Sequence, residues 1–175
     1  MTLGALLHTA ESDTAFAELV RLAGLPQGMA GDVQVVAPAA LRPLITAALA
    51  RQRHVLVVTA TGREAEDLAT GVGDFVDAPC AEFPAWETLP HERLSPSADT
   101  VGRRIEVLRS IATGAAPSVI VAPVRSVLQP IVRGLGRLPA LTIRTGEEID
   151  LDVVAHDLVV RGYLRTDLVE RRGQF

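Results

Sequence analysis

The sequence predicts an α/β fold in which a doubly wound parallel sheet is followed by the start of a smaller α+β domain. Two short apolar runs, at 54–59 and 118–122, are rich in β-branched residues, which is typical of strands buried on both faces. Segments with helical spacing of apolar residues lie between them. Strands that are separated by helices pair in parallel, through crossover connections.

The predicted elements follow in order from the N-terminus. Residues 1–30 carry two short helical patterns, the second of which ends at Gly24. We then expect a strand at 31–37, a helix at 38–51, the strand at 54–59, a helix at 62–72 that a capping box opens, and a strand near 76–80. A helix at 96–112, the strand at 118–122 and a helical turn at 124–129 complete this part.

A change of character near residue 134 predicts a domain boundary. Gly134, Gly136 and Pro139 indicate a linker. Beyond it we expect a strand at 141–144, a helix around 153–159 and a strand or hairpin at 163–175. The chain is therefore divided into a helical prelude (1–30), an α/β domain (31–133) and the first part of an α+β domain (138–175), which is expected to be truncated.

The composition indicates a globular protein that does not cross a membrane. Hydrophobic residues make up 48% and charged residues 22%, and no apolar run approaches the roughly 20 residues that span a bilayer. The N-terminus lacks a basic segment typical of a secretory signal. Cys80 is the only cysteine, which excludes an internal disulfide and fits a cytoplasmic localisation.

All 17 basic residues are arginine, and this excludes several kinds of site. Without lysine there is no phosphate-loop lysine, no Schiff-base lysine and no lysine general base. The net charge of −4 also argues against non-specific DNA binding, which depends on cationic surface.

A proline-rich stretch at 83–95 is expected to form a stiff, mostly extended loop. Ser95 is the expected N-cap of the following helix, with Pro96 at its first position. In that helix the apolar residues recur at helical spacing. Arg103, Arg104 and Glu106 are expected on its wetter sides.

Three stretches together resemble the N-terminal region of the bacterial transcription-repair coupling factor (Mfd), over most of residues 33–175. They are the run from Val55 to Ala69, the proline-rich loop at 83–95 (below, the motif loop) with the helix after it, and the segment from Gly162 to Phe175. In the motif loop and the helix after it, the residues that carry the resemblance are Trp86, Glu87, Pro90, Arg93, Ser95, Pro96, Arg103 and Arg104.

The resemblance implies a degenerate module with a fold similar to that of the excision-repair protein UvrB. In this family the module has lost its ATP site, and ATP and magnesium belong to a translocase motor further along the polypeptide. The implied partners are UvrA and, for the whole protein, stalled RNA polymerase and duplex DNA. The resemblance therefore implies an adaptor with no catalytic site and no cofactor within this chain.

The residues themselves agree that a phosphate loop is absent. Its pattern, G-x-x-x-x-G-K-[ST], would fall after the first predicted strand, where residues 36–43 contain neither glycine nor lysine. A second candidate is the stretch from Thr59 to Arg63, which either binds an anion at a helix N-terminus or is a plain capping box.

The last segment is the best candidate for a protein interface. Arginine and aromatic side chains are favoured where proteins bind one another. The candidate residues are Arg161, Arg165, Arg171, Arg172 and Phe175. For any one of these arginines, the alternative is an ordinary solvated face.

Other readings stay open. Trp86 either anchors the motif loop or stacks on a base, and His91 either has a local hydrogen bond or takes part in acid/base chemistry. A small-molecule-binding domain would hold its ligand where the strands end, near Ala37, Thr59 and Ala122. An active UvrB-like ATPase is the remaining rival, and the missing lysine counts against it.

Overall fold

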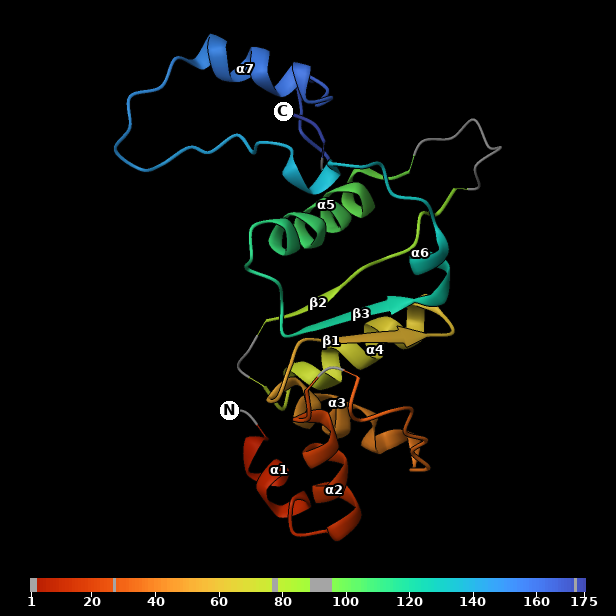
Figure 1. Ribbon diagram of the computed structural model, residues 1–175. Helices are drawn as coiled ribbons and strands as arrows, with labels where there is room; N and C mark the ends of the chain where they lie inside the picture. The colour runs from red at the N-terminus through yellow and green to blue at the C-terminus, as the bar shows by residue number, and fades with distance from the viewer. Residues whose placement is uncertain (1–2, 27, 77–78, 89–95, 172) are drawn as a thin grey trace.

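In the computed structural model, three parallel strands lie between two layers of helices (Figure 1). The structure describes residues 3–26, 28–76, 79–88, 96–171 and 173–175. The strands are β1 (Val55–Thr59), β2 (Cys80–Glu82) and β3 (Val119–Pro123), in the order β1-β3-β2. The predicted α/β class with a doubly wound parallel sheet is thereby confirmed.

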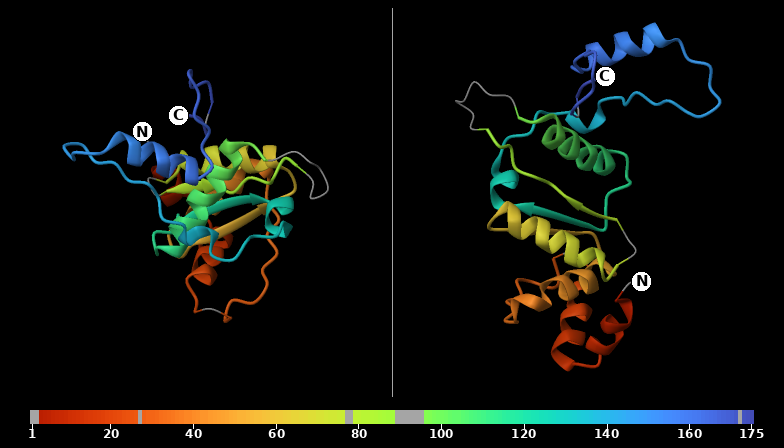
Figure 2. Two further views of the ribbon diagram at one scale, coloured as in Figure 1. Left: turned by 90° about the horizontal axis from the view of Figure 1, so that it is seen from above. Right: turned by 180° about the vertical axis from the view of Figure 1, so that it is seen from behind.

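The helices lie on both sides of this sheet. Their bounds are α1 (Gly4–Ala10), α2 (Thr14–Ala23), α3 (Arg42–Ala50), α4 (Gly62–Gly73), α5 (Ala98–Ala112), α6 (Val124–Leu128) and α7 (Leu151–Val160), with 3-10 turns η1 (Ala39–Leu41) and η2 (Leu135–Arg137). Figure 2 shows α5 on one side of the sheet and α3 and α4 on the other, while α7 lies beyond α5. Within the described residues, no helix has the length and apolar character needed to span a membrane.

The central strand β3 supplies the core on both faces because its side chains alternate. Val119 and Val121 pack in one buried cluster with residues of α4. Ala122 packs in another cluster with Val107 of α5. Its neighbours pair with it in register, Val55 with Val119 on one side and Cys80 with Val119 on the other.

Local capping explains where the helices begin. The Thr61 cap predicted for α4 is present, because the Thr61 hydroxyl accepts a hydrogen bond from the backbone N–H of Glu64 at 3.2 Å. The Glu64 carboxylate accepts in turn from the N–H of Ala60, one residue before the cap, so the capping box is formed only in part. The cap of α5 is Ser97 and not Ser95: the Ser97 side chain accepts from the backbone N–H of Thr100 at 3.2 Å. Pro96 therefore precedes the cap, where its missing N–H costs no helical hydrogen bond.

Two predicted strands do not form. Residues 31–37 form neither helix nor strand, and Val36 is 92% exposed. Residues 141–144 are likewise outside any ladder, and Ile143 is exposed. Both segments have β-type sequences, but neither pairs with a strand of the sheet in the described part of the chain. The third strand also begins later than predicted, at Cys80.

The last segment is neither a long strand nor a hairpin. A single parallel bridge pairs Leu164 with Gln174, and the backbone N–H of Thr166 donates to the carbonyl of Phe175 at 2.9 Å. Gly173 has a φ of +86°, which favours glycine. A hairpin requires antiparallel strands, so the chain here closes a loop instead.

The turn η2 packs on α5 through a close backbone approach. A Cβ added at Gly136 would lie 2.4 Å from the carbonyl oxygen of Leu108, which is backbone and cannot rotate away. By contrast, a Cβ added at Gly102, in the middle of α5, would meet nothing within 4 Å.

We expect Gly136→Ala to lower the free energy of unfolding by about 1–3 kcal/mol, because η2 must move away from α5. The matched control is Gly102→Ala, which we expect to raise it by about 0.5–1 kcal/mol through helix propensity. Urea unfolding of the two variants measures both. Equal stability of the two variants would contradict the close packing described here.

Candidate protein-interaction surface

The side chain of Arg104, on α5, is fully buried beneath the start of the motif loop. Its guanidinium carbon lies 4.1 Å from the centroid of the Phe83 ring and 4.2 Å from that of the Trp86 ring. Its Nη1 donates a hydrogen bond to the carbonyl oxygen of Pro84 at 2.6 Å. Burial lowers the pKa of Arg104, and the negative faces of the two rings offset part of the cost of removing its charge from water.

The prediction that Arg104 lies on a wetter side of its helix is wrong. Thr100, Arg104 and Val107 recur at helical spacing and form the buried face of α5. Among the described residues, the Nε and Nη2 atoms of Arg104 have no hydrogen-bond acceptor. The two aromatic rings therefore supply most of the compensation for the buried cation.

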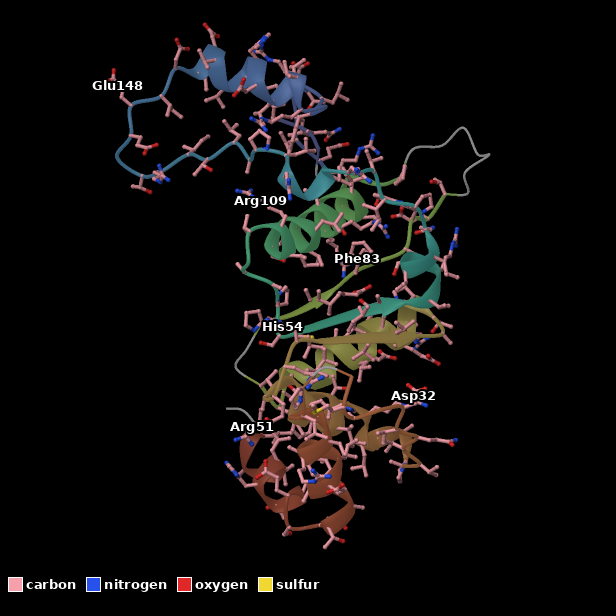
Figure 3. The ribbon with its side chains drawn as sticks, in the orientation of Figure 1. Asp32, Arg51, His54, Phe83, Arg109 and Glu148 are labelled. Carbon is pink, nitrogen blue, oxygen red and sulfur yellow. The ribbon has the colours of Figure 1, made fainter. Side chains whose placement is uncertain are left out.

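Phe83 joins this arrangement to the sheet. Its ring is buried in the cluster that contains Val107 and Ala122, and Figure 3 shows it between α5 and the strands. The backbone N–H of Phe83 donates to the carbonyl of Val121 at 2.8 Å, which continues the pairing of β2 with β3. The start of the motif loop is thus fixed on the sheet and on the helix at once.

Glu87 ties the same loop to the first turn of α5. Its carboxylate accepts hydrogen bonds from the Ser97 hydroxyl at 2.6 Å, from the Ser97 backbone N–H at 3.4 Å and from the Thr100 hydroxyl. Partial burial acts to raise the pKa of Glu87, but the hydrogen bonds outweigh it and lower the pKa to about 2.

Two further side chains, distant in the sequence, hold the motif loop and the start of α5 on the sheet. The side chain of Gln129, just after α6, accepts from the backbone N–H of Trp86 at 2.8 Å and donates to the Trp86 carbonyl at 3.4 Å. Arg103 forms an ion pair with Glu82 at the end of β2. Trp86 is therefore an anchor of the loop, as the first of the two readings predicted.

Most of the described motif residues thus serve to hold the loop on α5. Trp86 stacks on Arg104, and Glu87 accepts a hydrogen bond from Ser97. Arg103 forms its ion pair with Glu82, and Pro96 directly precedes the capping residue Ser97. The other motif residues, Pro90, Arg93 and Ser95, lie outside the described residues, and so does His91.

The C-terminal arginines differ in what they contact. Arg161 is engaged within the chain: it donates to the carbonyl of Pro139 and lies 4.0 Å from the Asp157 carboxylate. Arg165 and Arg171 are exposed, and their guanidinium groups form no ion pair with the described residues. Phe175 is half-buried and paired through its backbone, and Arg172 lies outside the described residues.

The two candidate anion sites offer little to a phosphate. Because residues 31–37 are not a strand, residues 36–43 lack the strand-to-helix turn of a phosphate loop; they lead into η1 and α3. At the start of α4, the backbone N–H of Ala60 donates to the Glu64 carboxylate at 3.2 Å, so the chain's own anion occupies this helix end. No group of three metal-ligating side chains is present among the described residues.

Sequence reasoning missed Ser97, Gln129 and Glu82, which position the motif loop. Ser97 had a detectable signal, since it precedes a helical run and stands three residues before Thr100. Gln129 and Glu82 had none, because their partners lie 43 and 21 residues away in the chain.

We expect Arg104→Lys to lower the free energy of unfolding by roughly 2–3 kcal/mol, since an ammonium group cannot lie flat between two rings. The fluorescence of Trp86, the only tryptophan, should shift to longer wavelength at a lower urea concentration in this variant than in the unchanged chain. Arg109→Lys, on the exposed face of the same helix, is the control and should change stability by less than about 0.5 kcal/mol. Similar effects of the two changes would argue against the stacked arrangement.

Glu87 should make stability depend on pH in the acid range. Its pKa is lower in the folded chain, at about 2, than its ordinary value of 4.5, so its contribution is present above pH 4.5 and is lost as the pH falls toward 2. Urea unfolding of the chain and of Glu87→Gln should therefore differ more at pH 6 than at pH 3. Solvent screening keeps the difference modest, and in a Ser97→Ala background it should shrink. A difference that grows toward pH 3 would contradict these hydrogen bonds.

No family model matches the chain. Over 97% of its length, however, the chain is 47% identical to the transcription-repair-coupling factor of Mycobacterium tuberculosis (strain CDC 1551 / Oshkosh). The corresponding Bacillus subtilis protein is 26% identical over 87% of the chain, and the Escherichia coli protein is 25% identical over 71%.

The chain is much shorter than these relatives. It spans 14% of the length of the mycobacterial protein, 13% of the Bacillus subtilis protein and 11% of the Escherichia coli protein. The match nevertheless runs through both the motif loop and nearly all of the rest of the chain in the mycobacterial case. As its motifs predicted, the chain matches an N-terminal fragment of a transcription-repair-coupling factor.

Proposed function

We propose that this chain is a non-catalytic adaptor region of a transcription-repair-coupling factor, which helps to bring UvrA to a stalled RNA polymerase. The observation that carries the proposal is the 47% identity to the mycobacterial factor over 97% of the chain. Within the proposal, ATP hydrolysis and movement on duplex DNA belong to other parts of the longer relatives. We place this activity in the cytoplasm.

The surface proposed to meet UvrA is the exposed part of the C-terminal segment. Arg165 and Arg171 stand in water without ion pairs to described residues, so their guanidinium groups are available for a partner's carboxylates. Leu168 and Val169, between them in the sequence, are 71% and 58% exposed. Arginine beside exposed apolar surface is a typical composition for a protein-binding site.

The motif loop has a different part in this proposal. Its described side chains, up to residue 88, are used inside the chain, so this part of the loop serves as the scaffold that fixes α5. The C-terminal segment lies against the first turn of α5, where a Cβ on Gly173 would come within 2.9 Å of Ala98. A rigid α5 would therefore give the arginine-bearing segment a fixed base.

A small-molecule-binding domain remains a second candidate because one cavity lies where such folds bind ligands. It has a volume of about 630 Å³ and lies beside the C-terminal end of β1 and the start of α4. Its polar lining includes Arg42, Thr59, Glu64 and Asp67. Two carboxylates against one guanidinium disfavour a nucleotide there, so isothermal titration with ATP should give no micromolar binding.

We expect immobilised chain to retain purified UvrA, and Arg165→Glu or Arg171→Glu to weaken that retention. Reversing a charge at an interface places like charges against the partner, so each change should raise the Kd about tenfold or more. Arg63→Glu, on the exposed face at the start of α4, is the matched control and should leave the Kd unchanged.

A parallel measurement should use a polypeptide that continues some tens of residues past Phe175. Binding by the longer polypeptide alone would move the UvrA site out of this chain while keeping the adaptor role. If neither bound UvrA, the recruitment role would have to be abandoned.

A further inference from the structure

A groove lies between the outer side of α5 and the loop formed by the C-terminal segment. Its volume is about 840 Å³. The apolar part of its lining comes from Val101 and Ile105 of α5 and from Tyr163 and Val169 of the loop. The backbone bridge between Leu164 and Gln174 closes this loop and so fixes the second wall of the groove.

Gly102, which also lines the groove, has no evident role inside the chain. It lies in the interior of α5, where glycine costs about 0.5–1 kcal/mol relative to alanine. At two other glycines an added Cβ would meet this chain: it would lie 3.0 Å from the ring of Pro43 at Gly71 and 2.4 Å from the Leu108 carbonyl oxygen at Gly136. A Cβ on Gly102 would meet only open space, so its missing side chain leaves room for something outside this chain.

The charges around the groove favour a cation. Glu106 and Glu170 line it, and neither carboxylate forms an ion pair within the part of the chain that the structure describes. Arg161 also lines it, but its guanidinium is already engaged by Pro139 and Asp157. Arg171 is the one remaining lining cation, so two carboxylates face a single uncommitted guanidinium.

We propose that this groove binds a protein segment in which an aliphatic side chain stands next to arginine or lysine. The aliphatic group would lie on Gly102 between Val101, Ile105 and Val169. The neighbouring cation would reach Glu106 or Glu170. This function goes beyond UvrA recruitment, since the groove's charge selects a basic segment. Val169 and Arg171 belong to both surfaces, but the test below uses no UvrA, so the two proposals can fail separately.

The test uses two blocked tetrapeptides, acetyl-Arg-Leu-Leu-Arg-amide and acetyl-Glu-Leu-Leu-Glu-amide, titrated into the isotopically labelled chain and followed by NMR. We expect the amide signals of Gly102, Ile105 and Val169 to move on addition of the arginine peptide. Its affinity should exceed that of the glutamate peptide by roughly threefold or more, as expected for net charge at a partly exposed site.

Variants separate the groove from a general effect. Gly102→Leu places a side chain in the groove, and its Cβ would meet nothing within 4 Å. We therefore expect it to abolish these shifts without lowering stability in urea unfolding. Gly73→Leu, at the open end of α4, is the matched control and should bind as the unmodified chain does. The double change Glu106→Gln with Glu170→Gln should remove the preference for the arginine peptide.

Several outcomes would overturn the proposal. They are shifts spread over the whole chain, equal binding of the two peptides, or binding that survives Gly102→Leu in a folded variant. Groove signals that move with the concentration of the chain alone would point instead to a second copy as the occupant. Absence of any shift with either peptide at millimolar concentration would also reject it.

Discussion

The burial of one guanidinium between two aromatic rings is the constraint on which the arrangement of this chain depends. A cation with no exposure to water is costly, and Arg104 is tolerated because Phe83, Trp86 and the Pro84 carbonyl surround it. All three belong to one short stretch of the motif loop. The side chain of Arg104 on α5 therefore holds the described start of this loop, residues 83–86, in place.

The sequence was most informative where a local pattern was enough. The apolar β-branched runs predicted both β1 and β3, but only β3 is buried on both faces, as this pattern leads one to expect. In β1, Leu56 and Val58 are exposed, so the expectation that this strand is buried on both faces is wrong. The Thr61 cap of α4 was also local. The strands expected at 31–37 and 141–144 failed because β propensity does not show whether an unpaired edge lies nearby.

The candidate site was harder to predict for the same reason. The motif loop stood out by its prolines and its tryptophan, but spacing alone placed Arg104 toward solvent. Its burial depends on Phe83 and Trp86 folding back over α5, and the hold of Gln129 on Trp86 bridges 43 residues. Such contacts arise from topology. A residue pattern can mark a loop as unusual, but it does not say whether the loop serves binding or packing.

The two sides of α5 connect these findings. Thr100, Arg104 and Val107 form its buried face, and Gly102 with Glu106 stand on the exposed face of the same turns. A helix transmits position between its faces because its backbone is continuous and hydrogen-bonded. The stack around Arg104 and the groove therefore lie on opposite faces of one helix. A partner bound in the groove would contact a helix that Arg104 holds against the motif loop from its other face.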